Sequence, residues 1–213
     1  FSGFVFKIQA NMDKKHRDRV AFMRLCSGKF ERGKKIFHVR SEKEMKIATP
    51  LMFQAQDREL TEEAYPGDII GLHDTGKLQI GDTFTEGEKV QYTGIPSFAP
   101  EIFNKVILKD PLKAKQLEKG LKQLSEEGTV QLFTRHTTRE NILGAVGILQ
   151  FEVVRQRLED EYNVRGQYES YPFSGIRWPK FPDDKTKKQF IEKNANNIVY
   201  DNKDRTCFSV RSE

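Results

Sequence analysis

The stretch that decides the fold of the C-terminal part is residues 110–128, DPLKAKQLEKGLKQLSEEG. Asp110 followed by Pro111 is a typical helix start, because a carboxylate can cap free backbone N–H groups and proline fits the first turn. Three leucines then recur at spacings of three and four residues, on one helix face: Leu117, Leu121 and Leu124. The glycine that closes the stretch ends the pattern. We therefore expect an amphipathic helix packed against a sheet.

Strand and helix patterns alternate around this helix. The expected strands, which are short apolar runs bounded by turn residues, are 102–108, 129–133, 142–146 and 164–171. A second amphipathic helix is expected over 148–162. The resulting order, β-α-β-β-α-β, is the split βαβ or ferredoxin-like plan. A C-terminal extension adds an expected helix at 184–194 and strands at 198–200 and 206–210.

The N-terminal part has a different pattern, with short β-like runs at intervals of about ten residues. The expected strands are 4–9, 20–26, 34–39 and 69–72. In the first, Phe4, Phe6 and Ile8 alternate with the residues between them, and two glycines around residues 28–33 suggest a hairpin-like return. Such spacing favours a small barrel or sandwich. The glycine and prolines of residues 93–100 mark a boundary, which divides the chain into domains 1–93 and 94–213.

The charges of the chain are unevenly distributed. Among its 213 residues, 36 Lys and Arg face 31 Asp and Glu, a net charge of +5. Twelve cations and four carboxylates lie in 14–46, whereas 57–89 holds nine carboxylates and three cations. Charge runs are usually solvated faces, but apolar residues alternate with this basic run. We expect a phosphate-binding face on one side of the barrel, away from the acidic strands.

Several functional classes find no support in the sequence. Residues 28–35, GKFERGKK, come closest to a phosphate loop, but lysine stands where Ser or Thr must hold Mg²⁺. Histidines share no metal-ligand spacing, and no nucleophile signature is present. Cys26 and Cys207 fit neither a disulfide framework nor a metal knuckle. We expect no catalytic, cofactor or metal site in this chain, no membrane segment, a cytoplasmic setting, and a piece of a longer protein.

Several strings together resemble bacterial peptide-chain release factor three, the translational GTPase of termination. They are FSGFVFKIQANMD (1–13), HRDRVAFMR (16–24), AYPGDIIGLH (64–73), IGDTFT (80–85), GIPSFAPE (94–101), LSEEG (124–128) and GAVGILQF (144–151). The barrel strings occur loosely in all translational GTPases, while the first two and the last are more specific. The likeness covers nearly the whole chain and fades after about Tyr171.

The resemblance implies a fold, a role and partners. The chain would be a translation-factor-type β-barrel of the domain II type followed by an α/β domain of the domain III type, both ribosome-binding. The missing GTPase domain would hold GTP or GDP and Mg²⁺ in the full-length protein, which would release and recycle class I release factors after peptide hydrolysis. Expected partners are small-subunit rRNA and proteins, class I release factors and the GTPase domain, with the factor itself a monomer.

The resemblance also points to candidate rRNA-binding residues. Cationic groups suited to rRNA phosphates lie in the matching segment at Lys15, His16, Arg17, Arg19 and Arg24. Ion pairs inside the barrel are an equally open role for Arg17 and Arg19. Two other identities also remain open: the equivalent domains of elongation factor G or a ribosome-protection factor, and a free-standing RNA-binding module.

Overall fold

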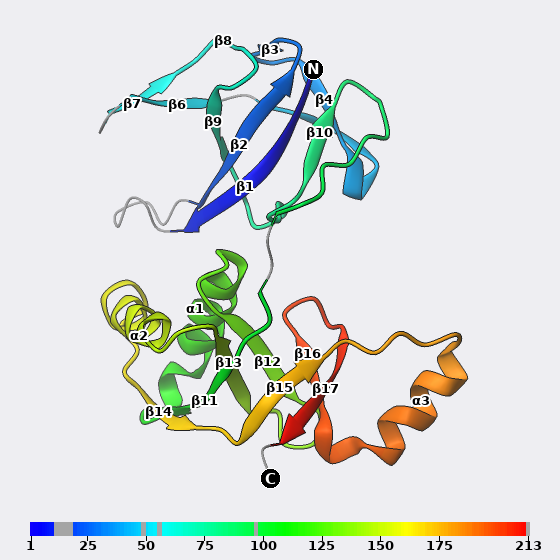
Figure 1. The fold of residues 1–213 in the computed structure, drawn as a ribbon. Coiled ribbons are helices and arrows are strands. Elements are labelled where there is room, and N and C mark those ends of the chain that lie inside the picture. The colour runs from blue at the N-terminus through cyan, green and yellow to red at the C-terminus, as the bar shows by residue number, and fades with distance from the viewer. Residues whose placement is uncertain (11–18, 48–49, 55–56, 96–97, 212–213) are drawn as a thin grey trace. The chain divides into compact units, whose positions relative to one another are not determined.

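The structure is a computed structural model that describes residues 1–10, 19–47, 50–54, 57–95 and 98–211, without the side chains of residues 53–59. It divides into two compact units, Phe1–Pro96 and Ser97–Glu213 (Figure 1). The sequence pattern places the division between residues 93 and 94. In the described part, no sheet contains strands of both units.

The first unit is an antiparallel half-barrel. Its strands are β1 (Ser2–Ala10), β2 (Arg19–Ser27), β3 (Phe30–Glu31), β4 (Lys35–His38), β5 (Lys43–Lys46), β6 (Leu51–Gln54), β7 (Asp57–Leu60), β8 (Glu63–Ala64), β9 (Ile69–His73) and β10 (Thr83–Thr85). Eight of them form one sheet in the order β5-β4-β10-β1-β2-β9-β6-β7, and β3 pairs with β8 in a small ribbon. A short 3₁₀ turn, Val39–Ser41, joins β4 to β5.

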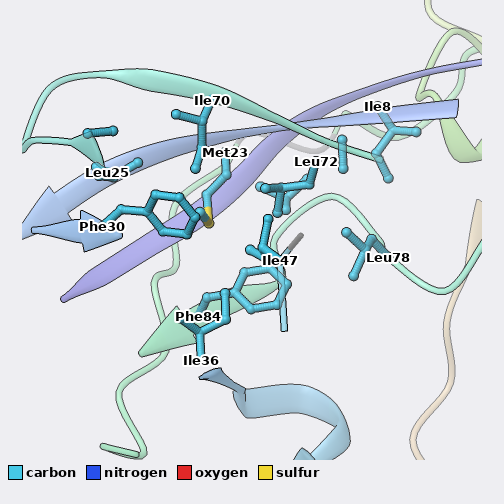
Figure 2. Packing of buried hydrophobic residues seen from close by; sticks show 13 residues of the cluster. Ile8, Met23, Leu25, Phe30, Ile36, Ile47, Ile70, Leu72, Leu78 and Phe84 are labelled. Atoms are coloured by element: carbon cyan, nitrogen blue, oxygen red, sulfur yellow. The ribbon is translucent and has the colours of Figure 1, made fainter. Parts of the chain in front are cut away.

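The core of this unit lies on the inner face of the curved sheet (Figure 2). Aromatic, aliphatic and sulfur-containing side chains from seven of the strands and the adjoining loops fill it, among them Met23, Phe30, Ile36, Ile70 and Phe84. Each of these is at most 1% exposed. Burial of this apolar surface is the main term that holds the unit together.

A β-bulge in β1 changes which residues face the core. The register between β1 and β2 shifts between Val5 and Lys7. Val5 and Ile8 are buried, while Phe4 and Phe6 are only half-buried and Lys7 is exposed. The expected alternation, which put Phe4 and Phe6 on the face of Ile8, was therefore wrong. An extra residue in one strand reverses the phase of the alternation beyond it.

The expected hairpin between the second and third strands was also wrong. Strand β2 pairs with β1 and β9, whereas β4 pairs with β10 and β5. Gly28 and Gly33 have φ values of 66° and 80°, and each allows a separate turn at one side of β3. The short strands β3, β5, β6, β7, β8 and β10 were not expected, because runs of two to four residues are too short to show a clear alternation.

The second unit has a ferredoxin-like centre and an extension. Its elements are β11 (Ile102–Leu108), α1 (Ala114–Glu126), β12 (Gln131–Arg135), β13 (Asn141–Ala145), α2 (Leu149–Tyr162), β14 (Gly166–Ser170), β15 (Phe173–Arg177), α3 (Asp184–Lys193), β16 (Ile198–Asp201) and β17 (Thr206–Arg211). The sheet order is β14-β11-β13-β12-β16-β17-β15, with every pair antiparallel. The first four strands form the expected split βαβ arrangement, so the predicted fold class is confirmed; β15 was not expected.

Helix α1 forms for the reasons read from its sequence. The Asp110 side chain accepts a hydrogen bond from the Leu112 backbone N–H at 3.0 Å, and Pro111 opens a 3₁₀ turn that leads into the helix. The three leucines of the predicted face are buried, in the same cluster as the buried residues of α2. Figure 1 shows α1 and α2 on one side of the sheet. A second cluster, which includes Phe103, Phe133 and Cys207, forms a separate core in this unit.

Candidate nucleic-acid interface

The predicted rRNA-binding residues divide between described and undescribed parts of the chain. Lys15, His16 and Arg17 lie outside the described residues. Arg19 and Arg24 both belong to β2, yet they have different environments. The first is buried and the second is exposed.

Arg19 makes an ion pair inside the half-barrel. Its side chain is 6% exposed, and Nε donates to Asp74 Oδ2 at 2.7 Å. A terminal nitrogen of Arg19 also donates to the Leu78 carbonyl at 3.0 Å. The other oxygen of Asp74 accepts from three backbone N–H groups in the same loop. Of the two roles open for Arg19, these contacts support the structural one, since a committed guanidinium has few donors left for a phosphate.

Arg24 lies on the outer face of the sheet. Its cross-strand partners are Phe4 on β1 and Ile69 on β9. Within the described residues its side chain makes no ion pair with a carboxylate. An exposed guanidinium without a carboxylate partner keeps its donors available for an external anion.

The basic and acidic segments are interleaved, so the expectation that their charges lie apart was wrong. Ion pairs between the two segments join Lys29 to Glu63, Arg32 to Glu62, Lys34 to Glu86, Arg40 to Asp82 and Lys89 to Glu42. The reason is topological. Strand β4 of the basic segment lies beside β10 of the acidic one, and β3 lies beside β8. Pairing of strands distant in sequence brings the opposite charges together.

Asp82 is the centre of the most buried of these clusters. Its carboxylate accepts from Arg40 Nη2 at 2.8 Å and from the Gln79 backbone N–H at 2.8 Å, and His38 Nε2 lies 2.9 Å away. Burial raises the pKa of Asp82, but the bonds from Arg40 and Gln79 outweigh it and hold this pKa below its ordinary value of 3.8. The cluster stabilises the loop before β10.

Aromatic residues gather near Arg24 on the outer face, a grouping that the sequence pattern does not indicate. The Phe6 and Phe22 rings are 6.5 Å apart, and Lys7 Nζ lies 5.7 Å from the Phe22 ring centroid. Phe4 packs on Tyr92 with centroids 5.5 Å apart. The grouping depends on the bulge in β1, and a bulge cannot be recognised from a single sequence.

The second unit uses its Trp mainly for packing. Trp178 is half-buried, its indole N–H donates to Asp201 at 3.0 Å, and its ring lies 6.2 Å from that of Phe133. These contacts place the ring against the second core cluster of this unit. In the part of the chain that the structure describes, no three metal-ligating side chains come together. No helix there is long and apolar enough to cross a membrane.

Comparisons with known proteins agree with this architecture. A crystal structure of a protein from Thermus thermophilus superimposes with a TM-score of 0.66 and 23% sequence identity, over 85% of this chain and 26% of that one. This likeness shows a shared fold, and the chain spans about a quarter of that protein's length.

Two family models match along the chain. Residues 1–87 match elongation factor G domain 2, and residues 92–213, more than half of the chain, match the class II release factor RF3, C-terminal domain. The order of the two matches is the order of the half-barrel and the α/β unit. The chain therefore belongs to the class II release factor RF3 family through its C-terminal domain, which follows a domain of the elongation factor G domain 2 type.

Proposed function

We propose that these two domains are the ribosome-binding part of a cytoplasmic translation-termination GTPase that promotes release and recycling of class I release factors after peptide hydrolysis. The observation that carries the proposal is the match of residues 92–213 to the release-factor domain. In the complete protein a GTPase domain would bind GTP or GDP with Mg²⁺. The two domains would position it on the small subunit and make no bond-breaking contribution of their own.

The contacts with the ribosome would be electrostatic in large part. Arg24, with Lys15, His16 and Arg17 of the preceding segment, would bind rRNA phosphates, which fix position more than sequence. The small-subunit rRNA and proteins, the class I factor and the GTPase domain are the proposed partners of a monomeric factor. Arg19 has no place in this interface, because its buried ion pair with Asp74 occupies it.

The match of residues 1–87 favours a second candidate, a role like that of elongation factor G. The test uses the complete protein and ribosomes that carry a fluorescent class I release factor after peptide hydrolysis. We expect the protein with GTP to accelerate loss of the fluorescent factor and to leave tRNA–mRNA translocation unchanged. Stimulated translocation without release of the class I factor would contradict the proposal.

Arg24→Glu tests the site within the same assay. We expect slower recycling and a log–log salt slope of ribosome binding that falls by about 0.7 to 0.9 per lost phosphate contact, with GTP affinity unchanged. The matched control is Lys35→Glu, which makes the same charge change at an exposed residue already paired with Glu44. Equal effects of the two variants would show that net charge, and not this site, governs binding.

A further inference from the structure

The bulge in β1 builds an aromatic and cationic cluster on the outer face of the half-barrel. Because of it, Phe6 and Lys7, although consecutive, both lie beside the Phe22 ring. The Phe6 ring centroid is 6.5 Å from that of Phe22, and Lys7 Nζ is 5.7 Å from the same centroid. In a regular strand consecutive side chains point to opposite faces. Bulges often re-aim a side chain in this way beside functional sites. The cluster therefore reflects a specific local geometry.

A second row of side chains lies beside this cluster. Phe4, Arg24 and Ile69 are cross-strand neighbours on β1, β2 and β9. The Phe4 ring is held by Tyr92, whose hydroxyl is hydrogen-bonded to Ser2 at 2.6 Å and whose backbone N–H donates to Thr83 Oγ1 at 3.0 Å. Ile69 is 41% exposed. Phe4 packs on Tyr92 and Phe6 packs on Phe22, and all three phenylalanines are half-buried, so part of each ring meets solvent.

The charge of this face is positive. Lys7 and Arg24 are exposed, and neither makes an ion pair with a carboxylate in the described residues. The cations that flank β3, Lys29 before it and Arg32 and Lys34 after it, are all paired with carboxylates. Two cations left without carboxylates beside packed aromatic rings match the chemistry of an RNA strand, whose bases stack on rings and whose phosphates seek cations.

We propose that the outer face of β1, β2 and β9 is a stacking platform for unpaired RNA bases. Phe4, Phe6 and Phe22 supply the rings, and Lys7 and Arg24 hold the flanking phosphates. The proposal rests on the proposed function and deepens it, since it names unpaired nucleotides as the part of the RNA that this face binds. Duplex RNA keeps its bases stacked on one another and would engage only the cations.

The test measures fluorescence anisotropy of a labelled 12-nucleotide single-stranded RNA of mixed sequence with the 213-residue chain, against the same RNA as a duplex. We expect tighter binding of the single strand. Phe6→Leu should weaken it about tenfold, because a stacked base is lost, and should leave the salt slope unchanged. Arg24→Gln and Lys7→Gln should each lower the slope by about 0.7. Phe6→Tyr, which keeps the ring, should bind like the parent chain.

Controls separate stacking from general effects. Tyr65 is 52% exposed and its ring lies 5.9 Å from Lys29 Nζ, but that lysine is paired with Glu63. Tyr65→Leu should therefore not change binding. Thermal melts identify any unfolded variant, and Phe4→Leu provides a second ring deletion if Phe6→Leu unfolds.

Three outcomes would overturn the platform. Equal binding by Phe6→Leu and Tyr65→Leu would mean that this face contacts only the phosphates of the RNA. Equal binding of single-stranded and duplex RNA would do the same. Failure to bind the single strand while the complete protein still recycles class I factors would refute the platform and leave the proposed function standing. Loss of recycling in the complete protein would refute the proposed function separately.

Discussion

Arg19 shows that burial can give a basic residue a structural role in place of a binding role. In the sequence it belongs to a run of cations, yet its guanidinium lies inside the half-barrel against Asp74, whose side chain is 1% exposed. Removing one partner of a buried ion pair leaves the other charge without compensation. The ion pair of Arg19 therefore connects β2 to the loop that follows β9.

We predict that Arg19→Met lowers the free energy of unfolding by about 3 to 5 kcal/mol. The double variant Arg19→Met, Asp74→Asn should recover part of this loss, because Asn keeps the oxygen that accepts the backbone N–H groups of the loop. Urea unfolding of the four members of the cycle measures the coupling. A single variant as stable as the parent chain would show that the guanidinium is dispensable to the fold.

Asp82 contributes to the stability of the half-barrel in a way that depends on pH. The pKa of this carboxyl is lowered from 3.8 in the folded state, so its contribution to stability is present above pH 3.8 and disappears as pH falls through the lower folded value. We expect Asp82→Asn to be less stable than the parent chain at pH 7 and to lose less stability below pH 4. Chemical unfolding from pH 7 to pH 3 tests this. Parallel profiles for the two proteins would contradict it.

At the scale of elements, the close approach of α1 and α2 depends on one glycine. A Cβ atom at Gly120 would lie 2.5 Å from Leu158 Cδ2 and 3.1 Å from the Tyr162 ring. Both neighbours belong to α2, and Leu158 is fully buried. A side chain at this position must therefore push the helices apart or displace packed groups.

We predict that Gly120→Ala destabilises the second unit by about 1 to 3 kcal/mol from overpacking, partly offset by about 1 kcal/mol from the better helix propensity of alanine. The control is Gly147→Ala, where a Cβ would meet nothing within 4 Å. Shifts in the urea midpoint compare the two. A Gly120→Ala chain as stable as the control would mean that α2 relaxes freely.

Elements set by local signals were predictable from the sequence. Helix α1 is one, because the Asp110 cap of the 3₁₀ turn that leads into the helix and the leucine spacing of the helix act within a few residues of each other. The pairing of β4 with β10 was not predictable, since it depends on residues far apart in sequence. Strand β15 was missed because it is short, lies between prolines and contains Gly175.

The candidate site shows the same limit. The exposed position of Arg24 follows from simple alternation along β2, because the residues on either side of it in the sequence, Met23 and Leu25, are buried. Phe6 could not be assigned to the outer face, because the bulge in β1 reverses the alternation. The ion pairs between the basic and acidic segments arise from strand order, which local patterns do not encode.

At the scale of the whole molecule, each unit has its own core. The cluster of the half-barrel contains buried residues from Val5 to Phe84, while the two clusters of the second unit run from Phe103 to Cys207. None of these clusters draws buried residues from both units. A unit with a complete core of its own can fold alone.

We predict that chains ending at Pro96 and beginning at Ser97 each fold separately. Each should show a cooperative thermal transition by circular dichroism. The control is a chain cut within the half-barrel, after His73, which removes β10 and should not fold. A half that unfolds without cooperativity would show that its stability depends on the other unit.

The position of β1 in the sheet has a consequence for the newly made chain. Strand β1 lies between β2 and β10, so its first neighbour emerges early in synthesis and its second only when residues 83–85 appear. Until then one edge of an apolar strand has unpaired N–H and C=O groups, which invite pairing with other nascent chains. The arrival of β10, only three residues long, closes that edge. A pause in synthesis before residue 83 would thus prolong the period in which this domain can aggregate or bind chaperones.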